Sequence, residues 1–176
     1  ADLDVMGGGV IQTFTYASGH GGNISVTAQE SVSLSGFQTI SESGDQAALS
    51  GLYSNTFGTG HGGSISVTTD VMTVRDNGLI TSETVGGNLG HGGDVTLAVN
   101  RLEMDSGYVS ASARTDGNTR DTGAGGNVSI TATESVSISG GDDKKLYGDY
   151  HGVYSQAQGT GNSGSITIRS NQLTAT

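Results

Sequence analysis

Gly90-His91-Gly92-Gly93-Asp94-Val95-Thr96-Leu97 decides the fold, because a glycine-rich corner here runs straight into a short strand of alternating apolar and polar residues. The chain repeats this segment, which we call the corner motif, at 19–26, 60–67, 123–130 and, more weakly, 161–168. Recurrence at such intervals is the sequence signature of a solenoid. Glycine permits backbone conformations with positive φ, so we expect the corner glycines to close a bend.

Two further segments accompany the corner motifs. A second short strand, with apolar residues at alternate positions, is expected at 32–34, 72–74, 102–104 and 136–138. After a turn, a third strand is expected at 37–40, 79–82 and 108–113. Each strand has too few apolar residues to form a core alone. We therefore predict an all-β, triangular parallel β-helix solenoid of about five coils, in which equivalent strands of successive coils pair at roughly 4.8 Å.

The repeats run through the whole chain, so we expect residues 1–176 to form a single β-helix domain. Both ends break off within a coil and neither carries a recognisable polar cap. This pattern favours a segment of a longer shaft, or a unit that stacks end to end on copies of itself. The repeat length varies mainly through insertions expected on one edge of the tube, at 43–59, 114–122 and 141–159.

Composition excludes several classes of partner. The net charge is -10 with only 7 Lys plus Arg, so no basic stripe could neutralise the phosphates of nucleic acid or an anionic membrane. No apolar run approaches the roughly 18 residues needed to cross a bilayer, so no membrane insertion is expected. There is no cysteine, and disulfides therefore give no information about the redox compartment.

The order of these segments resembles the repeats of filamentous-haemagglutinin-like exoproteins. The shared words are G-x-G-G-x-[IV]-x-[VIL], then [VLM]-x-[VLMI], then G-x-[IV]-x-[AS], and they cover nearly the whole chain, from Leu3 to Ala175. The family comprises the secreted partners of two-partner secretion systems. The resemblance implies a right-handed β-helix, secretion through an outer-membrane transporter to the bacterial cell surface, and a role in adhesion or biofilms. A recognisable N-terminal secretion domain is not part of the sequence.

The least repetitive stretch is the loop at 141–154, which we expect to be a candidate ligand-binding surface. It contains both lysines and three of the six tyrosines. Tyrosine rings stack on sugars or peptides, and neighbouring charged groups add directional hydrogen bonds. The alternative is a solvated insertion whose tyrosines cover the flank of the tube. The candidate binding residues are Lys144, Lys145, Tyr147, Asp149, Tyr150, His151 and Tyr154.

Three histidines, His20, His61 and His91, occupy the same position in successive corner motifs. Stacked along one edge, they would form a column that could share a transition metal. Ala124 and Asn162 take the equivalent place in later motifs, and no carboxylate or thiol with ligand spacing accompanies the column. We therefore predict no metal site and no cofactor, and interpret the histidine as a tolerated corner residue.

Catalytic residues are not evident either. A β-helical polysaccharide lyase or hydrolase needs acids that converge on one wall of the tube. The outward positions of the second strands carry two acids, Asp4 and Glu103, which would lie three coils apart, roughly 14 Å. This is too far for a pair of catalytic carboxylates, and the sequence predicts a protein that is not an enzyme.

The function expected from the sequence is a structural or adhesive segment of a secreted cell-surface exoprotein. Its expected partners are neighbouring coils or copies of itself, the transporter during secretion, and host or matrix glycans or proteins. A self-assembling filament subunit is one alternative. A carbohydrate-active or carbohydrate-binding module is the other.

Overall fold

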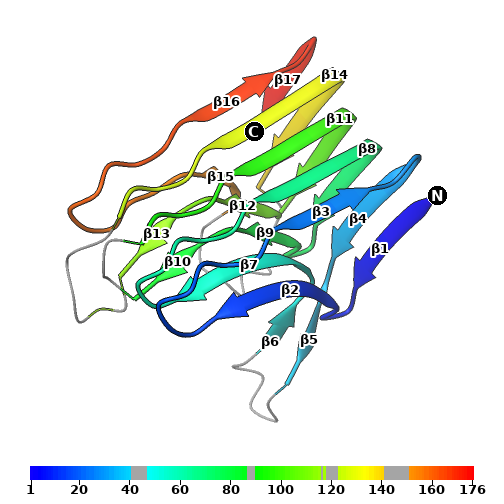
Figure 1. The fold of residues 1–176 in the computed structure, drawn as a ribbon. Coiled ribbons are helices and arrows are strands. Elements are labelled where there is room, and N and C mark those ends of the chain that lie inside the picture. Colours follow the sequence, from blue (N-terminus) through cyan, green and yellow to red (C-terminus); the bar gives the residue numbers. More distant parts are fainter. Residues whose placement is uncertain (41–46, 87–89, 116, 118–122, 141–150) are drawn as a thin grey trace.

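The structure, a computed structural model, describes residues 1–40, 47–86, 90–115, 117, 123–140 and 151–176. These residues form strands and connections without any helix, so none of them belongs to a helix that could span a membrane. Two parallel sheets, A and B, contain most of the strands (Figure 1). The strands are stacked in rows, and we call the strands that one repeat contributes to the two sheets a row. The fold is therefore all-β with parallel sheets, as predicted.

Sheet A is formed by the segments that the sequence analysis assigns to first and second strands. Its order is β1-β4-β8-β11-β14-β16, with β3 also paired to β8 and β17 to β14. All of these pairs are parallel. The strands are β1 (Asp2–Met6), β3 (Ile24–Thr27), β4 (Ser31–Ser35), β8 (Ile65–Arg75), β11 (Val95–Asp105), β14 (Val128–Ser139), β16 (Ile166–Arg169) and β17 (Gln172–Ala175).

Sheet B is formed by the segments between successive strands of sheet A. Its order is β13-β10-β7-β9-β12-β15, with β2 also paired to β7. These pairs are parallel too. The strands are β2 (Val10–Thr15), β7 (Gly51–Phe57), β9 (Leu79–Thr81), β10 (Thr84–Val85), β12 (Tyr108–Ser110), β13 (Ala113–Arg114) and β15 (Gly152–Tyr154).

The expected register between repeats is confirmed in sheet A. Val95 pairs with Ile65 on one side and with Val128 on the other, and Leu102 pairs with Met72 and Val136. Apolar side chains therefore form continuous columns, as pairing of equivalent segments requires. The columns meet apolar residues of sheet B in one core, which includes Val32, Met72, Leu102, Leu52, Ile80 and Val109.

The number of strands per repeat differs from the expected three. In β8, β11 and β14 the first and second expected strands are one continuous strand of 11 or 12 residues. The residues between the two apolar pairs, such as 68–71, include no glycine, so the backbone stays extended across the expected corner. A register shift between Val99 and Arg101 marks the place where it bends.

The expected strand at 37–40 exists, but its expected place in the stack of third strands is wrong. β5 (Phe37–Thr39) pairs antiparallel with β6 (Ala47–Leu49) in a separate two-stranded sheet. β7 takes the place beside β9 in sheet B that the segment 37–40 was expected to fill. Its Gly51 pairs with Leu79, and its Leu52 pairs with Ile80. Leu52 is fully buried, whereas Phe37 is half-buried, so the later segment fits the core better. The expected insertion 43–59 thus contains a strand of sheet B.

The other two expected insertions also reach sheet B. β15 lies within 141–159 and pairs with β12, and Arg114, the first residue of 114–122, ends β13. Residues 141–150, 116 and 118–122 lie outside the described residues. The variable edge predicted from sequence is therefore partly built into the second sheet.

The corner glycines are required for a reason other than the expected one. None of the glycines described in the corner motifs has a positive φ. A Cβ on Gly93 would instead collide with the carbonyl oxygen of Gly63, and one on Gly126 with that of Gly93. Successive corners therefore stack backbone on backbone, without space for a side chain. Positive φ occurs where sheet A turns towards sheet B, at Asp76, Asn77 and Ser106.

Hydroxyl groups on and directly beside the strands of sheet B, most of them buried, hold these corners in place. Serine hydroxyls donate to glycine carbonyls, and threonine hydroxyls donate to the carbonyls of the corner histidines at 2.7–3.0 Å. Because each buried hydroxyl has an acceptor, its burial carries little desolvation penalty. The serine pairs are Ser54–Gly22, Ser82–Gly63 and Ser155–Gly126, and the threonine pairs are Thr15–His20, Thr56–His61 and Thr84–His91.

Candidate binding site

The three corner histidines form a stack. The ring centroids of His20 and His61 are 4.8 Å apart, and those of His61 and His91 are 4.7 Å apart, with interplanar angles of 2° and 18°. Each Nδ1 accepts a hydrogen bond from the backbone N–H of the next corner. The donors are His61 at 3.0 Å, His91 at 2.9 Å and Ala124 at 2.8 Å. The column expected from sequence therefore exists.

This geometry opposes metal binding. When Nδ1 accepts a hydrogen bond, the proton of the neutral imidazole resides on Nε2, so neither nitrogen offers a free lone pair. Among the described residues, no group of three or more histidines, cysteines or acids could hold a metal ion. Burial lowers the pKa of His61, and the charges of protonated His91 and His20 lower it further. The stack thus favours neutral rings that bridge one corner to the next.

The predicted binding loop at 141–154 is described only at its end. Lys144, Lys145, Tyr147, Asp149 and Tyr150 lie outside the described residues. His151 and Tyr154 are described: the Tyr154 hydroxyl donates to the His151 carbonyl at 2.9 Å. The Tyr154 ring stacks on Tyr108 of β12, with a centroid distance of 5.2 Å. The end of the loop is therefore anchored on sheet B beside the pocket described next.

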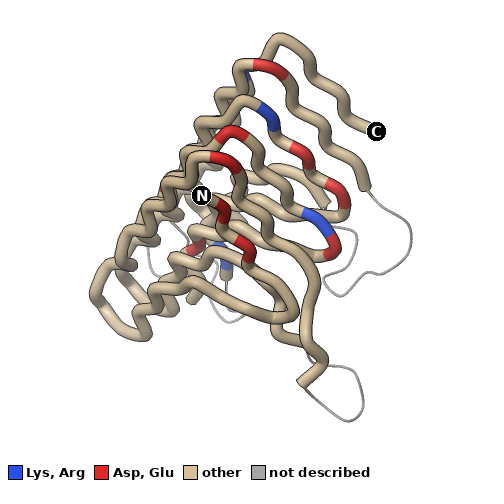
Figure 2. The backbone as a smooth tube through the Cα atoms, turned by 90° about the vertical axis from the view of Figure 1, so that its right-hand side faces the viewer, with Lys and Arg blue, Asp and Glu red and all other residues tan. Residues whose placement is uncertain are grey.

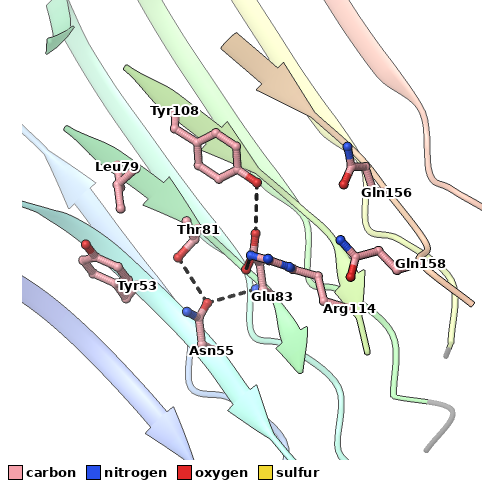
Figure 3. Close-up of a pocket in the computed structure, with 9 residues that line it drawn as sticks. All are labelled: Tyr53, Asn55, Leu79, Thr81, Glu83, Tyr108, Arg114, Gln156 and Gln158. Atoms are coloured by element: carbon pink, nitrogen blue, oxygen red, sulfur yellow. Dashed lines mark hydrogen bonds and ion pairs between the residues drawn. The ribbon is translucent and has the colours of Figure 1, made fainter. Parts of the chain in front are cut away.

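A pocket of about 150 Å³ lies on sheet B. Leu52, Ile80 and Val109 of this sheet are buried in the core. Side chains alternate between the two faces of a strand, so their neighbours along the chain face the other way. These neighbours build the pocket (Figure 3). Its lining residues are Tyr53, Asn55, Leu79, Thr81, Glu83, Tyr108, Arg114, Gln156 and Gln158.

Glu83 is the central group of this pocket. Its side chain is 6% exposed, and its carboxylate accepts a hydrogen bond from the Tyr108 hydroxyl at 3.3 Å. Arg114 donates to the other carboxylate oxygen at 3.4 Å. Burial raises the pKa of Tyr108, and the adjacent Glu83 charge raises it further. The tyrosine therefore stays protonated and keeps donating to the carboxylate.

Asn55 orients the backbone around Glu83. Its side-chain oxygen accepts hydrogen bonds from the Thr81 hydroxyl at 3.2 Å and from the Glu83 backbone N–H at 3.0 Å. Thr84 pairs with Thr56 of β7, so Glu83 and Asn55 lie at equivalent places on neighbouring rows. The amide thus locks two rows of sheet B together directly beneath the pocket.

Sequence reasoning missed Asn55, Glu83 and Tyr108 as site residues. They come from three repeats, and neither their spacing nor a motif connects them. One signal was available: Glu83 is an isolated acidic residue among the serine and threonines of 81–84. Arg114 was identified only as the start of an insertion. The register of sheet B brings these residues together.

The pocket differs from a hydrolase site. Glu83 is the single carboxylate among the described residues that line it, and acid–base hydrolysis of a glycosidic bond requires two. On sheet A, Asp4 and Glu103 occupy rows separated by β4 and β8, as the predicted register requires. Figure 2 shows acidic segments spread along the chain, with few basic ones among them. The arrangement at Glu83 is therefore suited to recognition by hydrogen bonding.

Comparison with known proteins yields no relative. No family model, curated protein or solved structure matches this chain. The resemblance to filamentous-haemagglutinin-like repeats therefore stays a prediction from the motifs, and function has to be argued from the geometry of the chain itself.

Proposed function

We propose that this chain is a structural and adhesive segment of a secreted bacterial cell-surface protein, built as a right-handed parallel β-helix. The observation that supports this most directly is the alternation of sheets along the chain. From β7 to β17 the chain visits sheet B and sheet A in turn, always with parallel pairing to the previous visit. Such a path is a coil whose rows are added one at a time.

The distribution of side chains supports a scaffold role. Apolar columns fill the interior, and the outward positions of the first strands carry small hydroxyl residues: Ser25, Ser66, Thr96, Ser129 and Thr167. Such a wall provides rigidity and solubility, and its small hydroxyl side chains do not form a cluster of charged or reactive groups. A rigid scaffold of this kind positions surfaces that lie elsewhere, and its variable edge on sheet B is the place for contact with a ligand.

The cell-surface location can be tested on intact cells of a producing bacterium. We expect an antibody raised against this segment to label intact cells, and an externally added protease to remove the label. A cytoplasmic protein released by the same bacterium serves as the lysis control. Labelling that requires lysis would contradict secretion. Loss of the segment without any decrease in attachment to surfaces would contradict the adhesive role.

A self-assembling filament subunit is a second candidate, because the apolar columns of sheet A repeat from row to row and would match the same columns of another copy. Ile166 is 44% exposed and Leu173 is 56% exposed, although their column neighbours Val128 and Val136 are buried. At the other end, Ile11 of β2 is 37% exposed, while Leu52 beside it is fully buried. A second copy of the chain offers rows with the matching apolar pattern.

Sedimentation over a range of concentrations tests this candidate. Stacked copies predict species that grow with concentration, and Leu173→Lys should abolish them because it places a charge in the apolar column. Thr174→Lys, on the outward face of the same strand, is the matched control and should leave assembly intact. A monomer at every concentration would contradict the filament.

A further inference from the structure

The pocket around Glu83 departs from the repetition that governs the rest of the fold. The inward columns of the two sheets hold similar apolar side chains from row to row, such as Ile65, Val95 and Val128 in sheet A and Leu52, Ile80 and Val109 in sheet B. The pocket combines an asparagine, a glutamate and a glutamine from three of four consecutive rows, and the row between the glutamate and the glutamine has Ser112 at the equivalent place. A scaffold requires only small side chains at these positions, so the departure calls for a reason beyond folding.

Burial of the carboxylate strengthens this point. A buried carboxylate loses its hydration, and the loss is offset only when the charge is paired and hydrogen-bonded. Glu83 has both kinds of partner, yet replacement of such a pair by apolar residues is often neutral or stabilising. The Glu83–Arg114 pair is therefore poorly explained by stability, whereas a binding site uses it to fix donors and acceptors in place.

The charge balance of the pocket indicates a neutral ligand. Arg114 offsets Glu83, and no other charged side chain of the described residues lines the cavity. The Arg114 side chain is 40% exposed, so part of its guanidinium faces the opening. A cation would meet this guanidinium, and an anion would meet the carboxylate behind it. Neither kind of ion finds an uncompensated opposite charge.

The polar groups suit a ligand with several hydroxyls. The side-chain amides of Gln156 and Gln158 have no hydrogen-bond partner within the described part of the chain, and each offers both a donor and an acceptor. The Asn55 amide adds two donors, since its interactions with Thr81 and Glu83 use its oxygen. The cavity therefore offers both donors and acceptors, and a sugar hydroxyl can pair with either.

Shape and size agree with a sugar ring. The rings of Tyr53 and Tyr108 form walls of the cavity (Figure 3), and the faces of tyrosine rings pack against the C–H surface of sugars. A cavity of about 150 Å³ accepts a six-membered ring, because an engineered cavity of that volume binds benzene. The hydroxyls that a pyranose carries in addition would extend to the open side of the cavity, where part of the Arg114 guanidinium lies.

We propose that this pocket binds one neutral hexopyranose unit of a glycan, held by the hydrogen-bonding groups of Asn55, Glu83, Arg114 and Gln156 between the rings of Tyr53 and Tyr108. The pocket rests on its own geometry. It depends on the proposed function only in that an adhesive segment at the cell surface would meet such glycans.

The test is a titration of the purified, isotope-labelled chain with methyl glycosides of glucose, galactose and mannose, followed by two-dimensional NMR. We expect at least one glycoside to bind saturably, with a dissociation constant on the order of 1 mM for a single ring. The shifted amide signals should cluster at Asn55, Glu83, Tyr108 and Gln156. Tetramethylammonium and acetate are the charged comparison ligands.

Variants locate the binding in the pocket. Glu83→Gln removes the charge and keeps the size of the side chain, so we expect binding to weaken by about tenfold. Gln156→Ala should weaken it by about threefold, and this variant serves as the test should Glu83→Gln not fold. Thr96→Ala, on the outward wall of sheet A, is the matched control and should bind like the parent chain.

Three results would overturn the proposal. The first is that no glycoside shifts the pocket signals of the folded chain at 50-fold above the expected dissociation constant. The second is that a charged comparison ligand binds there and no glycoside does. The third is unchanged glycoside binding in both pocket variants. Because the titration uses purified protein, its outcome is independent of whether the chain proves to be secreted.

Discussion

Sheet A and the outer face of sheet B are built on the same rows, yet they use the rows differently. In sheet A, each row places an equivalent residue at the same register position, as with Met72, Leu102 and Val136. On the outer face of sheet B, Asn55, Glu83 and Gln156 lie at equivalent places on three of four consecutive rows and differ in size and charge. Repetition thus maintains the two parallel sheets, while the break in repetition coincides with the surface for which we propose a separate task.

The largest expected effect concerns the repeated columns. Leu102 is fully buried in the apolar column of sheet A, whereas Leu173 of the same column is 56% exposed. Leu102→Ala should lower the free energy of unfolding by about 2–5 kcal/mol, because it removes buried methyl groups and leaves a cavity. Leu173→Ala should lower it by less than about 1 kcal/mol. Urea denaturation measures both, and equal losses would contradict the column arrangement.

The next effect concerns the stacked corners. Gly93→Ala places a Cβ against the Gly63 carbonyl and the Ser82 hydroxyl, so it should destabilise the fold by about 1–3 kcal/mol. Gly140→Ala is the matched control, because a Cβ there meets no atom of the described residues within 4 Å. Thermal unfolding compares the two variants. A normal midpoint for Gly93→Ala would show that the corners do not stack this closely.

A third variant should stabilise sheet A. The Thr69 hydroxyl is buried without a hydrogen-bond partner among the described residues, and the equivalent residue on the next strand is Val99. Thr69→Val removes the unpaired hydroxyl and preserves the shape, so we expect a gain of about 1 kcal/mol in the free energy of unfolding. Thr68→Val changes an exposed neighbour and should give no gain. Destabilisation by Thr69→Val would mean that the hydroxyl has a partner.

Tyr108, on the outer face of sheet B, should make the stability of the fold sensitive to high pH. Burial and the Glu83 charge raise the pKa of Tyr108 above its usual value of 10.0. The folded state therefore retains a proton that the unfolded state loses, and this contribution to stability, complete below pH 10, declines as the pH rises further. Tyr108→Phe should flatten the decline between pH 9.5 and 11, measured by denaturant unfolding. Tyr16→Phe, at an exposed site, should leave the decline unchanged.

The smallest expected effect on stability comes from the histidine stack, whose rings recur at equivalent positions and can take up protons. The pKa of His61 lies below its usual value of 6.5 in the folded state. Stability from this residue is therefore complete above pH 6.5 and decreases as the pH falls, because the unfolded state takes up the proton first. His61→Asn should reduce this acid sensitivity between pH 6.5 and 5, whereas His151→Asn should preserve it. A steeper acid loss in His61→Asn would contradict the neutral stack.

The repeating order of the strands could be predicted from the sequence alone. Alternating apolar residues, glycine corners and their intervals identified an all-β, parallel arrangement and the register of sheet A, because a period of two and a repeat of constant order are local properties of the chain. The sequence also placed the three histidines at equivalent positions, which the stack confirms.

Packing determines which segments form sheet B and which side chains meet in the pocket on its outer face. The choice of β7 over the segment at 37–40 depends on which side chains fit between the sheets, and spacing does not encode that fit. Glu83 is 28 residues from Asn55 and 31 from Arg114, as counted along the chain, and row stacking makes them neighbours. Contacts between rows are long-range in sequence, which is why the candidate pocket emerged from packing rather than from a motif.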